Sequence, residues 1–196
     1  MSRCPAAADV EGSKAAIDAM GGPVVLVGHS YGGSIITEAG NHPNVAALVH
    51  IAAFALDEGE SCASIEQACR RHRRRSIRTS NGLWWIDEPH FAADFAADIP
   101  RDEAEFMAIS QVPISTDSFT HQVKNPAWKH KPTWYMVASE DRSINPDQER
   151  MMANRAKAKT VEVKASHVAY MTFPKETAAL IEEAASSAQV KSVAGA

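Results

Sequence analysis

The sequence has few cysteines, no excess of positive charge and no apolar run long enough to cross a bilayer. Its three cysteines, Cys4, Cys62 and Cys69, are odd in number and lack the spacing of a zinc site. A secreted disulfide framework is therefore not expected, and no secretory signal is visible near Met1. The longest apolar stretch, 45–56, is too short for a membrane span. We predict reduced thiols in a soluble, cytoplasmic protein.

The charge balance excludes a general nucleic-acid binder. Lys and Arg number 20 against 24 Asp and Glu, which gives a net charge of -4 at pH 7. A chain of 196 residues with 45% hydrophobic residues is long enough to bury one globular core. His121 and His130 have no ligand spacing, so we predict no metal and no cofactor. The expected partner is a small molecule, without nucleic acid or membrane.

Helices and short buried strands alternate along the chain. Apolar runs rich in β-branched residues predict strands at 24–27, 45–54, 133–137 and 160–163. Helices are expected at 6–20, 34–39, 146–157 and 175–185, with the last ten residues frayed. This alternation is typical of an α/β fold with a mostly parallel sheet and helices on both faces. Residues 57–125 interrupt it and are too long for an ordinary connection, which predicts a cap inserted into a core of 1–56 and 126–196.

A serine turn follows the first predicted strand. Residues 28–32, Gly-His-Ser-Tyr-Gly, match the pattern G-x-S-x-G between a buried strand and a helix, the context in which it marks a nucleophile. The sharp turn requires small residues, and we assign that role to Gly28 and Gly32, while Gly33 lets the following helix pack close to the sheet. The turn places the Ser30 hydroxyl at a helix N-terminus, where backbone N–H groups favour negative charge. We therefore predict Ser30 as the nucleophile and the N–H of Tyr31 as an oxyanion donor.

A serine hydroxyl needs a neighbouring base, and the base needs an acid to orient it. His167 follows the fourth predicted strand and Asp141 follows the third, so both lie where active sites of parallel sheets collect. We predict that His167 accepts the proton of Ser30 and that Asp141 fixes the imidazole. Two other acids stay open: Glu140, next in sequence to Asp141, and Asp57, after the second strand.

Together these segments resemble the small bacterial α/β hydrolases (alpha/beta hydrolase fold). The resemblance rests on residues 22–33, 45–54, 126–142 and 161–167. It implies an α/β-hydrolase fold with a serine triad, which esterases, plant-type methyl esterases and hydroxynitrile lyases share. The first expectation is a serine esterase that acts on a small carboxylic ester through an acyl-Ser30 intermediate. A hydroxynitrile-lyase-like reaction on the same triad is the alternative.

The sequence departs from this family before the serine turn. The family usually has further strands there, and one of them ends in a His-Gly turn that supplies the second oxyanion N–H. Here 23 residues precede Val24, and the sequence contains no His-Gly pair. We therefore expect an N-terminally truncated hydrolase without a visible second oxyanion donor. Its serine strand would lie at a sheet edge, which favours pairing into a homo-oligomer; a catalytically silent binding module is a further alternative.

Candidates for the substrate pocket come from three places in the sequence. The cap contributes Trp85, the serine turn contributes His29, and the end of the second strand contributes Phe54. Most other aromatic residues of the cap are expected to form the core of the cap itself.

Overall fold

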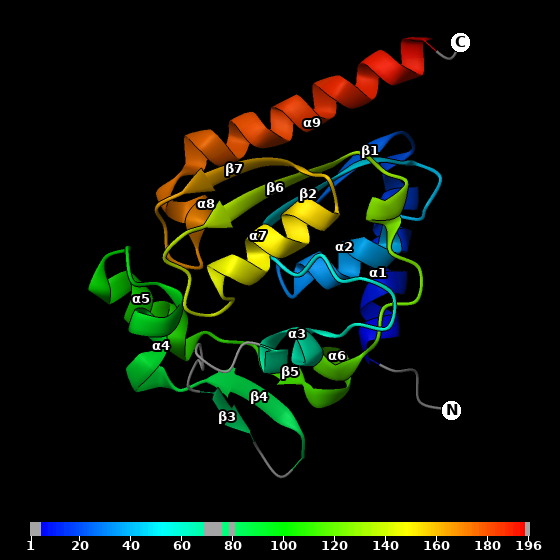
Figure 1. The fold of residues 1–196 in the computed structure, drawn as a ribbon. Coiled ribbons are helices and arrows are strands. Elements are labelled where there is room, and N and C mark those ends of the chain that lie inside the picture. The colour runs from blue at the N-terminus through cyan, green and yellow to red at the C-terminus, as the bar shows by residue number, and fades with distance from the viewer. Residues whose placement is uncertain (1–4, 69–75, 79–80, 195–196) are drawn as a thin grey trace.

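A parallel sheet forms the centre of the molecule in the computed structural model, which describes residues 5–68, 76–78 and 81–194. Its strands are β1 (Val24–Ser30), β2 (Val45–Ala53), β6 (Thr133–Ala138) and β7 (Lys159–Val163), in the spatial order β1-β2-β6-β7 (Figure 1). Each neighbouring pair runs parallel, so the carboxyl ends of all four strands meet at one edge. The predicted α/β class and mostly parallel sheet are confirmed.

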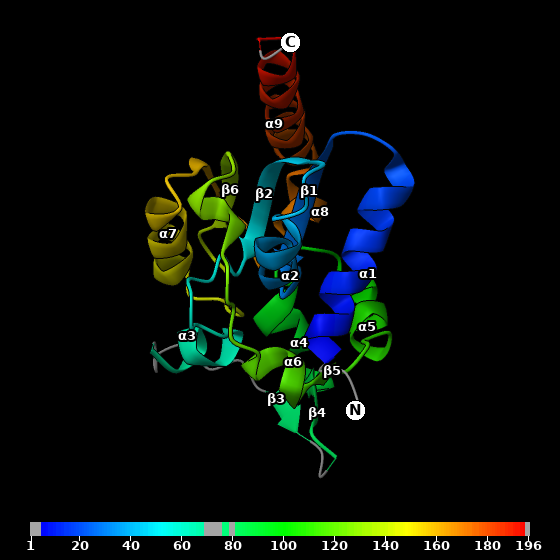
Figure 2. The same cartoon turned by 90° about the vertical axis from the view of Figure 1, so that its right-hand side faces the viewer.

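Helices cover both faces of this sheet because its strands are apolar on both sides. The helices are α1 (Pro5–Met20), α2 (Gly32–Ala39), α7 (Pro146–Arg155), α8 (Ala169–Thr172) and α9 (Pro174–Ala194). Leu48 of β2 packs in one cluster with Ile36 of α2 and Met152 of α7. Its neighbour Val49 points to the opposite cluster, which contains Leu180 of α9. The helix α1 packs against α2, at the β1 side of the sheet (Figure 2).

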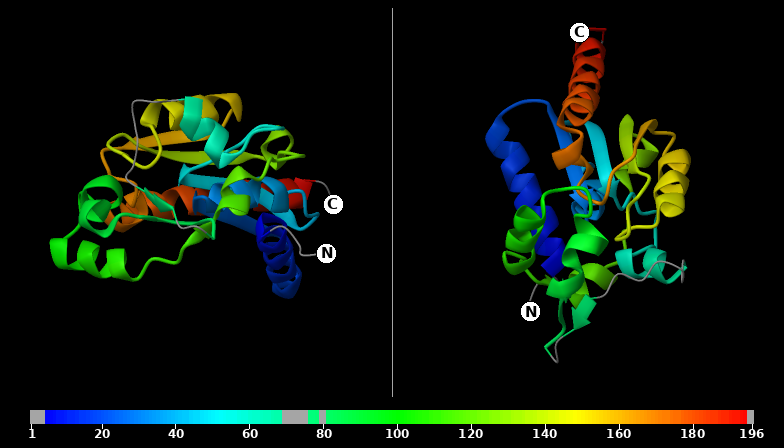
Figure 3. Two further views of the ribbon diagram at one scale, coloured as in Figure 1. Left: turned by 90° about the horizontal axis from the view of Figure 1, so that it is seen from below. Right: turned by 90° about the vertical axis from the view of Figure 1, so that its left-hand side faces the viewer.

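The closing helix is longer than the sequence analysis predicts. The expected helix ended at 185 with a frayed tail, whereas α9 continues to Ala194. Figures 2 and 3 show its last turns projecting beyond the sheet. The sequence of α9 is rich in alanine and contains no glycine or interior proline, so helix propensity continues the helix where packing does not require it.

Between β2 and β6 the chain forms a second, smaller unit of structure within the predicted cap. It contains α3 (Cys62–Ala68), β3 (Ser76–Arg78), β4 (Leu83–Ile86), α4 (Glu88–Phe95), α5 (Arg101–Ile109), β5 (Ile114–Ser115) and α6 (Thr116–Thr120), and the single turn η1 (Ala127–Lys129) follows it. The strands β3, β4 and β5 pair antiparallel. Phe91, Ala104 and Ala108 form a local core that Val168 joins from the main body. These elements lie below the main sheet in Figure 1.

The structure bears on the predicted thiols and on the predicted lack of a membrane span only for the described residues. Cys62 is a buried free thiol, whereas Cys4 and Cys69 lie outside the described residues. None of the described helices combines the length and the hydropathy that a membrane span requires.

A buried histidine in β2 couples the stability of the fold to pH. His50 is fully buried, and its ring stacks on Tyr135 at a centroid distance of 5.8 Å. Neither ring nitrogen has a hydrogen-bond partner among the residues that the structure describes. Burial lowers the pKa of His50 from 6.5 to about 3. The unfolded chain binds a proton at this imidazole below about pH 6.5, whereas the folded chain does not until about pH 3. Acid therefore favours the unfolded state throughout that interval.

We expect His50→Leu to weaken this dependence on pH. Between pH 7 and pH 5 the parent protein should lose about 2 kcal/mol of unfolding free energy through His50 alone, and the variant should not. Urea unfolding at the two pH values measures the difference. His130→Leu, at an exposed position, is the matched control and should follow the parent. Equal losses in the parent and in His50→Leu would contradict the assignment.

Candidate active site

Ser30 lies at a strained point where a strand passes into a helix. It is the last residue of β1, and its φ of 53° is in the left-handed region that residues with a side chain rarely adopt. Tyr31 follows as the N-cap of α2. Such strain persists only where the surrounding structure enforces it, and it is concentrated at functional sites. The turn holds the serine side chain at the carboxyl edge of the sheet and beside the N-terminus of α2.

Glycines make the turn possible, and two of the three predicted positions require one. A Cβ on Gly28 would lie 2.8 Å from the carbonyl oxygen of Gly32, which is closer than packing allows. A Cβ on Gly33 would lie 2.6 Å from the carbonyl oxygen of Phe54. A Cβ on Gly32 would have no neighbour within 4 Å. The steric demand therefore falls on Gly28 and Gly33, because Gly33 brings α2 against the end of β2.

The structure pairs the predicted base with the predicted acid. The Nδ1 atom of His167 lies 2.5 Å from Oδ2 of Asp141, and both side chains are buried. A carboxylate only accepts hydrogen bonds, so Nδ1 carries the proton and Nε2 keeps its lone pair. The Nε2 atom has no hydrogen-bond partner in the described part of the chain. This is the tautomer that a general base requires.

Asp141 is held as an anion. Burial is the largest single influence and raises its pKa, but the charge and hydrogen bond of His167, together with the other hydrogen bonds of the carboxylate, outweigh burial, so the pKa of Asp141 is lowered. Its Oδ1 atom accepts hydrogen bonds from the backbone N–H groups of Ser143, at 2.6 Å, and Ile144, at 3.0 Å. One carboxylate oxygen of Asp141 therefore binds backbone N–H groups of its own loop, and the other accepts the hydrogen bond from the imidazole.

The two alternative acids are engaged elsewhere. Glu140 is exposed and forms an ion pair with Lys164 at 3.5 Å. Asp57 forms an ion pair with Lys129 at 2.6 Å. No contact of either carboxylate with His167 is found among the described residues, so the geometry favours Asp141 as the acid.

His29 connects the serine turn to the loop that carries the base. Its Nε2 atom donates a hydrogen bond to the carbonyl oxygen of His167 at 2.9 Å, and the two rings lie 4.6 Å apart. Burial lowers the pKa of His29 to about 3, and the neighbouring His167 adds to this effect. His29 is therefore a neutral donor that fixes the residue before Ser30 against the base.

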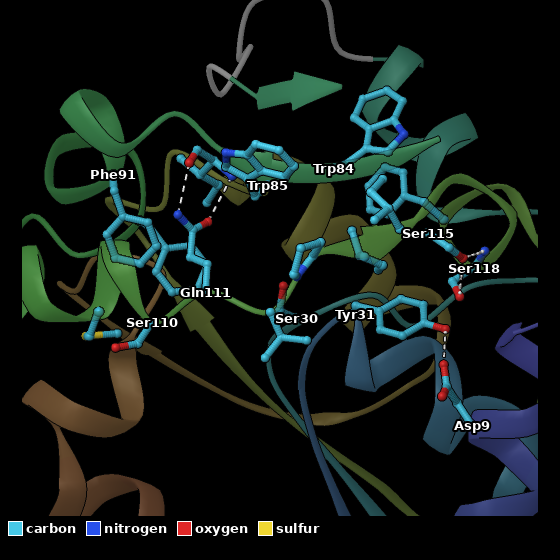
Figure 4. A pocket seen from close by; sticks show the side chains of 18 residues that line it. Asp9, Ser30, Tyr31, Trp84, Trp85, Phe91, Ser110, Gln111, Ser115 and Ser118 are labelled. Atoms are coloured by element: carbon cyan, nitrogen blue, oxygen red, sulfur yellow. Dashed lines mark hydrogen bonds between the residues drawn. The ribbon is translucent and has the colours of Figure 1, made fainter. Parts of the chain in front are cut away.

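Ser30 opens into a cavity of about 760 Å³ between the main body and the cap (Figure 4). Most of its lining is apolar and includes Trp84, Trp85, Phe91 and Phe95. The ring of Phe95 also lies 4.7 Å from the ring of His167, so the cavity and the base share a wall.

Only one of the three predicted pocket residues lines this cavity. Trp85 does, on β4. Phe54 instead lies fully buried behind the wall, with its ring edge against Phe119, a lining residue. His29 points toward the base loop, as described above, because neighbouring residues of a strand face opposite sides. Nothing in the described residues groups three His, Cys, Asp or Glu side chains that could hold a metal ion.

The sequence analysis missed a contact that ties the cap to the base loop. Asp98, between α4 and α5, accepts hydrogen bonds from the backbone N–H of Ser166, at 2.8 Å, and from its hydroxyl. It also accepts one from Thr172 at 3.1 Å. Ser166 directly precedes His167. No local pattern distinguishes Asp98 from other loop acids, so the sequence carried no signal for this contact.

Comparison with known proteins places these features in context. The model of the Alpha/beta hydrolase family matches residues 2–180. No curated protein matches the chain. Solved structures with a similar fold include an extracellular alpha/beta-hydrolase from a Paenibacillus species, at 21% identity and a TM-score of 0.69, covering 89% of this chain and 77% of that one.

Two further structures are similar over most of their length. A methylesterase from Arabidopsis shares 17% identity with a TM-score of 0.68, covering 84% of this chain and 70% of that one. A pyrethroid hydrolase from Sphingobium faniae shares 21% identity with a TM-score of 0.63, covering 86% of this chain and 71% of that one. At these identities the likeness is one of fold.

Proposed function

Since this chain belongs to the alpha/beta hydrolase family, we propose that it is a serine hydrolase that cleaves a carboxylic ester through an acyl-Ser30 intermediate. One arrangement carries the proposal. A strained serine opens into a large cavity, and the adjacent His29 donates a hydrogen bond to the backbone of His167. The buried His167 ring pairs with Asp141, and its Nε2 atom has no hydrogen-bond partner among the described residues. The esterases and hydrolases among the similar folds support the same reaction class.

The proposed reaction proceeds in two halves. The Oγ atom of Ser30 attacks the ester carbonyl carbon while Nε2 of His167 takes the hydroxyl proton. The negative charge on the former carbonyl oxygen is stabilised by the N–H of Tyr31 at the start of α2. His167 then protonates the leaving alcohol, and the acyl group stays on Ser30. Water, deprotonated by His167, releases the acid and restores the serine, while Asp141 stabilises the imidazolium in each half.

The cavity indicates the kind of ester. Its volume of about 760 Å³ is within the range of pockets that hold drug-sized ligands. Six aromatic side chains line it, and they favour an uncharged and largely apolar molecule. We therefore extend the expected small ester to one with a bulky apolar group.

Asp9 should make the site discriminate against anionic esters. Among the residues that line the cavity it is the one with a charged side chain, and its Oδ2 atom accepts a hydrogen bond from the hydroxyl of Tyr31 at 2.9 Å. Asp9→Asn should raise kcat/KM for para-nitrophenyl hemisuccinate by about fivefold relative to the uncharged pentanoate, because it removes a repulsion of about 1 kcal/mol.

The control for this prediction is Asp18→Asn on the same helix. Asp18 is exposed and forms an ion pair with His42, and it does not line the cavity. It should leave the ratio of the two esters unchanged. An unchanged ratio in Asp9→Asn as well would show that Asp9 does not act on the substrate.

Labelling with a fluorophosphonate tests the proposed function directly. One adduct by intact mass, mapped to the peptide that contains Ser30, is the expected result, together with hydrolysis of para-nitrophenyl esters. Adduct formation without hydrolysis but with cyanide release from a cyanohydrin would indicate a lyase. A protein that unfolds cooperatively yet forms no adduct would overturn the proposal in favour of a silent binding module.

A further inference from the structure

A second acidic side chain lies behind the catalytic pair. Glu149, in the first half of α7, is fully buried. Its Oε2 atom accepts the backbone N–H of Ala138 at 3.1 Å, whereas its Oε1 atom has no donor in the described part of the chain. Glutamate is almost never buried to this degree without a partner. A carboxyl group in this position is therefore either charged, which destabilises the fold, or protonated and neutral.

The neighbours of Glu149 determine whether its carboxyl group is charged or protonated. Its carboxyl group is within hydrogen-bonding reach of the carboxyl group of Asp141. Tyr135 on β6 is the other titratable neighbour from the sheet, and it donates its hydroxyl proton to the carbonyl oxygen of Ala53. The positive charge of Arg150, on the same helix, acts on Glu149, but the Arg150 guanidinium is bound to Glu162 and to Asp147. Among the described residues, no ion pair joins Glu149 to a cation.

Two carboxyl groups that are joined by a hydrogen bond hold a proton between them, because a carboxylate can only accept hydrogen bonds. Asp141 has the imidazole and two backbone N–H groups as partners, which favour its anion. Burial raises the pKa of Glu149 well above its usual value, and the charge of Asp141 raises it further. These neighbours therefore favour the proton on Glu149.

We propose that Glu149 is a positioning residue that donates a hydrogen bond from its protonated carboxyl group to Asp141 and so tunes the charge that Asp141 presents to His167. The inference rests on the proposed function in assigning His167 as the base. The hydrogen bond withdraws negative charge from Asp141, which weakens its hold on an imidazolium. Variants of Glu149 test this effect on the pair.

Two substitutions separate this role from simple packing. Glu149→Gln keeps a donor for Asp141 and an acceptor for Ala138. Glu149→Met keeps the volume but removes both. The rate of fluorophosphonate labelling as a function of pH is the readout. We expect the labelling rate of Glu149→Gln to stay within about twofold of the parent at each pH. In Glu149→Met, the acid limb of the profile, where the rate falls at low pH, should move up by about one pH unit, since loss of a charge-assisted hydrogen bond shifts titration on this scale.

Each other outcome overturns the proposal. Unchanged pH profiles in both variants, whatever their melting temperatures, would indicate a structural role alone. A shift of the acid limb to lower pH in Glu149→Gln would indicate that Glu149 is ionised in the parent. Removal of its negative charge would then destabilise the imidazolium form of His167.

A second measurement distinguishes failure of this inference from failure of the proposed function. The proton between His167 and Asp141 is fully buried and should give a downfield ¹H NMR resonance without any substrate. We expect its shift and its pH dependence to change in Glu149→Met and to be retained in Glu149→Gln. If this change occurs in a protein that never labels, the positioning role stands and the proposed hydrolase activity falls. If labelling occurs and the resonance is the same in all three proteins, the positioning role falls.

Discussion

Ser30→Ala is expected to lower the rate of ester hydrolysis by on the order of 10⁶-fold, because it removes the atom that forms the acyl intermediate. The cavity is otherwise unchanged, so KM should stay close to that of the parent. Initial rates on a para-nitrophenyl ester, with intact mass after fluorophosphonate treatment, measure both effects. The variant should form no adduct.

Ser118→Ala is the matched control for this substitution. Ser118 lines the same cavity, and its hydroxyl accepts a hydrogen bond from the hydroxyl of Ser115 at 2.9 Å. We expect its activity to stay within tenfold of the parent, since its hydroxyl has no proposed role in bond formation. Ser30→Ala with appreciable activity, or loss of labelling in Ser118→Ala, would remove Ser30 from its assigned role.

The second large effect is expected from Asp141→Asn, at about 10⁴-fold in kcat. The reason lies in the partners of the two carboxylate oxygens. Because Oδ1 accepts two backbone N–H groups, from Ser143 and Ile144, an asparagine must place its carbonyl oxygen there. Its amide N–H₂ then faces Nδ1 of His167, which becomes an acceptor. The proton moves to Nε2, and the imidazole can no longer take the proton of Ser30.

Glu140→Gln tests the same assignment from the neighbouring position. Glu140 is an exposed carboxylate adjacent in sequence, paired with Lys164. We expect its activity within twofold of the parent. Steady-state rates and thermal unfolding of both variants should be measured together, because Asp141 is buried. Loss of activity in Glu140→Gln with a normal rate in Asp141→Asn would reverse the two roles.

The parts of the site that the sequence predicts are those with a local signature. The serine turn combines a buried strand, glycines and a helix start within a few residues, and Asp141 and His167 each directly follow a recognisable strand. Parallel strands bring such positions to one edge whatever the rest of the chain does. The order of the sheet and the pairing of Asp141 with His167 agree with that logic.

The parts that the sequence does not predict depend on how distant elements meet. The sequence predicts that Gly33 lets α2 pack close to the sheet, but not that its partner is the backbone of Phe54, since that contact joins two separate elements. Phe54 itself falls behind the cavity wall for the same reason. Glu149 is an ionisable residue in a polar helix, which in a sequence indicates a solvated face, yet it is buried. Burial of this kind follows from the packing of α7 and not from its pattern.

The hydrogen bonds from Ser166 and Thr172 to Asp98 bear on how this scaffold can be recombined. Exchange of the cap for that of a relative is an attractive route to a new specificity, because the cap supplies most of the cavity wall. Here the exchanged cap would also carry Asp98, which accepts the hydrogen bonds that hold Ser166, the residue before His167. A functional chimaera must therefore inherit Asp98 and Ser166 from the same parent, so the natural unit of transplantation extends beyond the cap into the loop after β7.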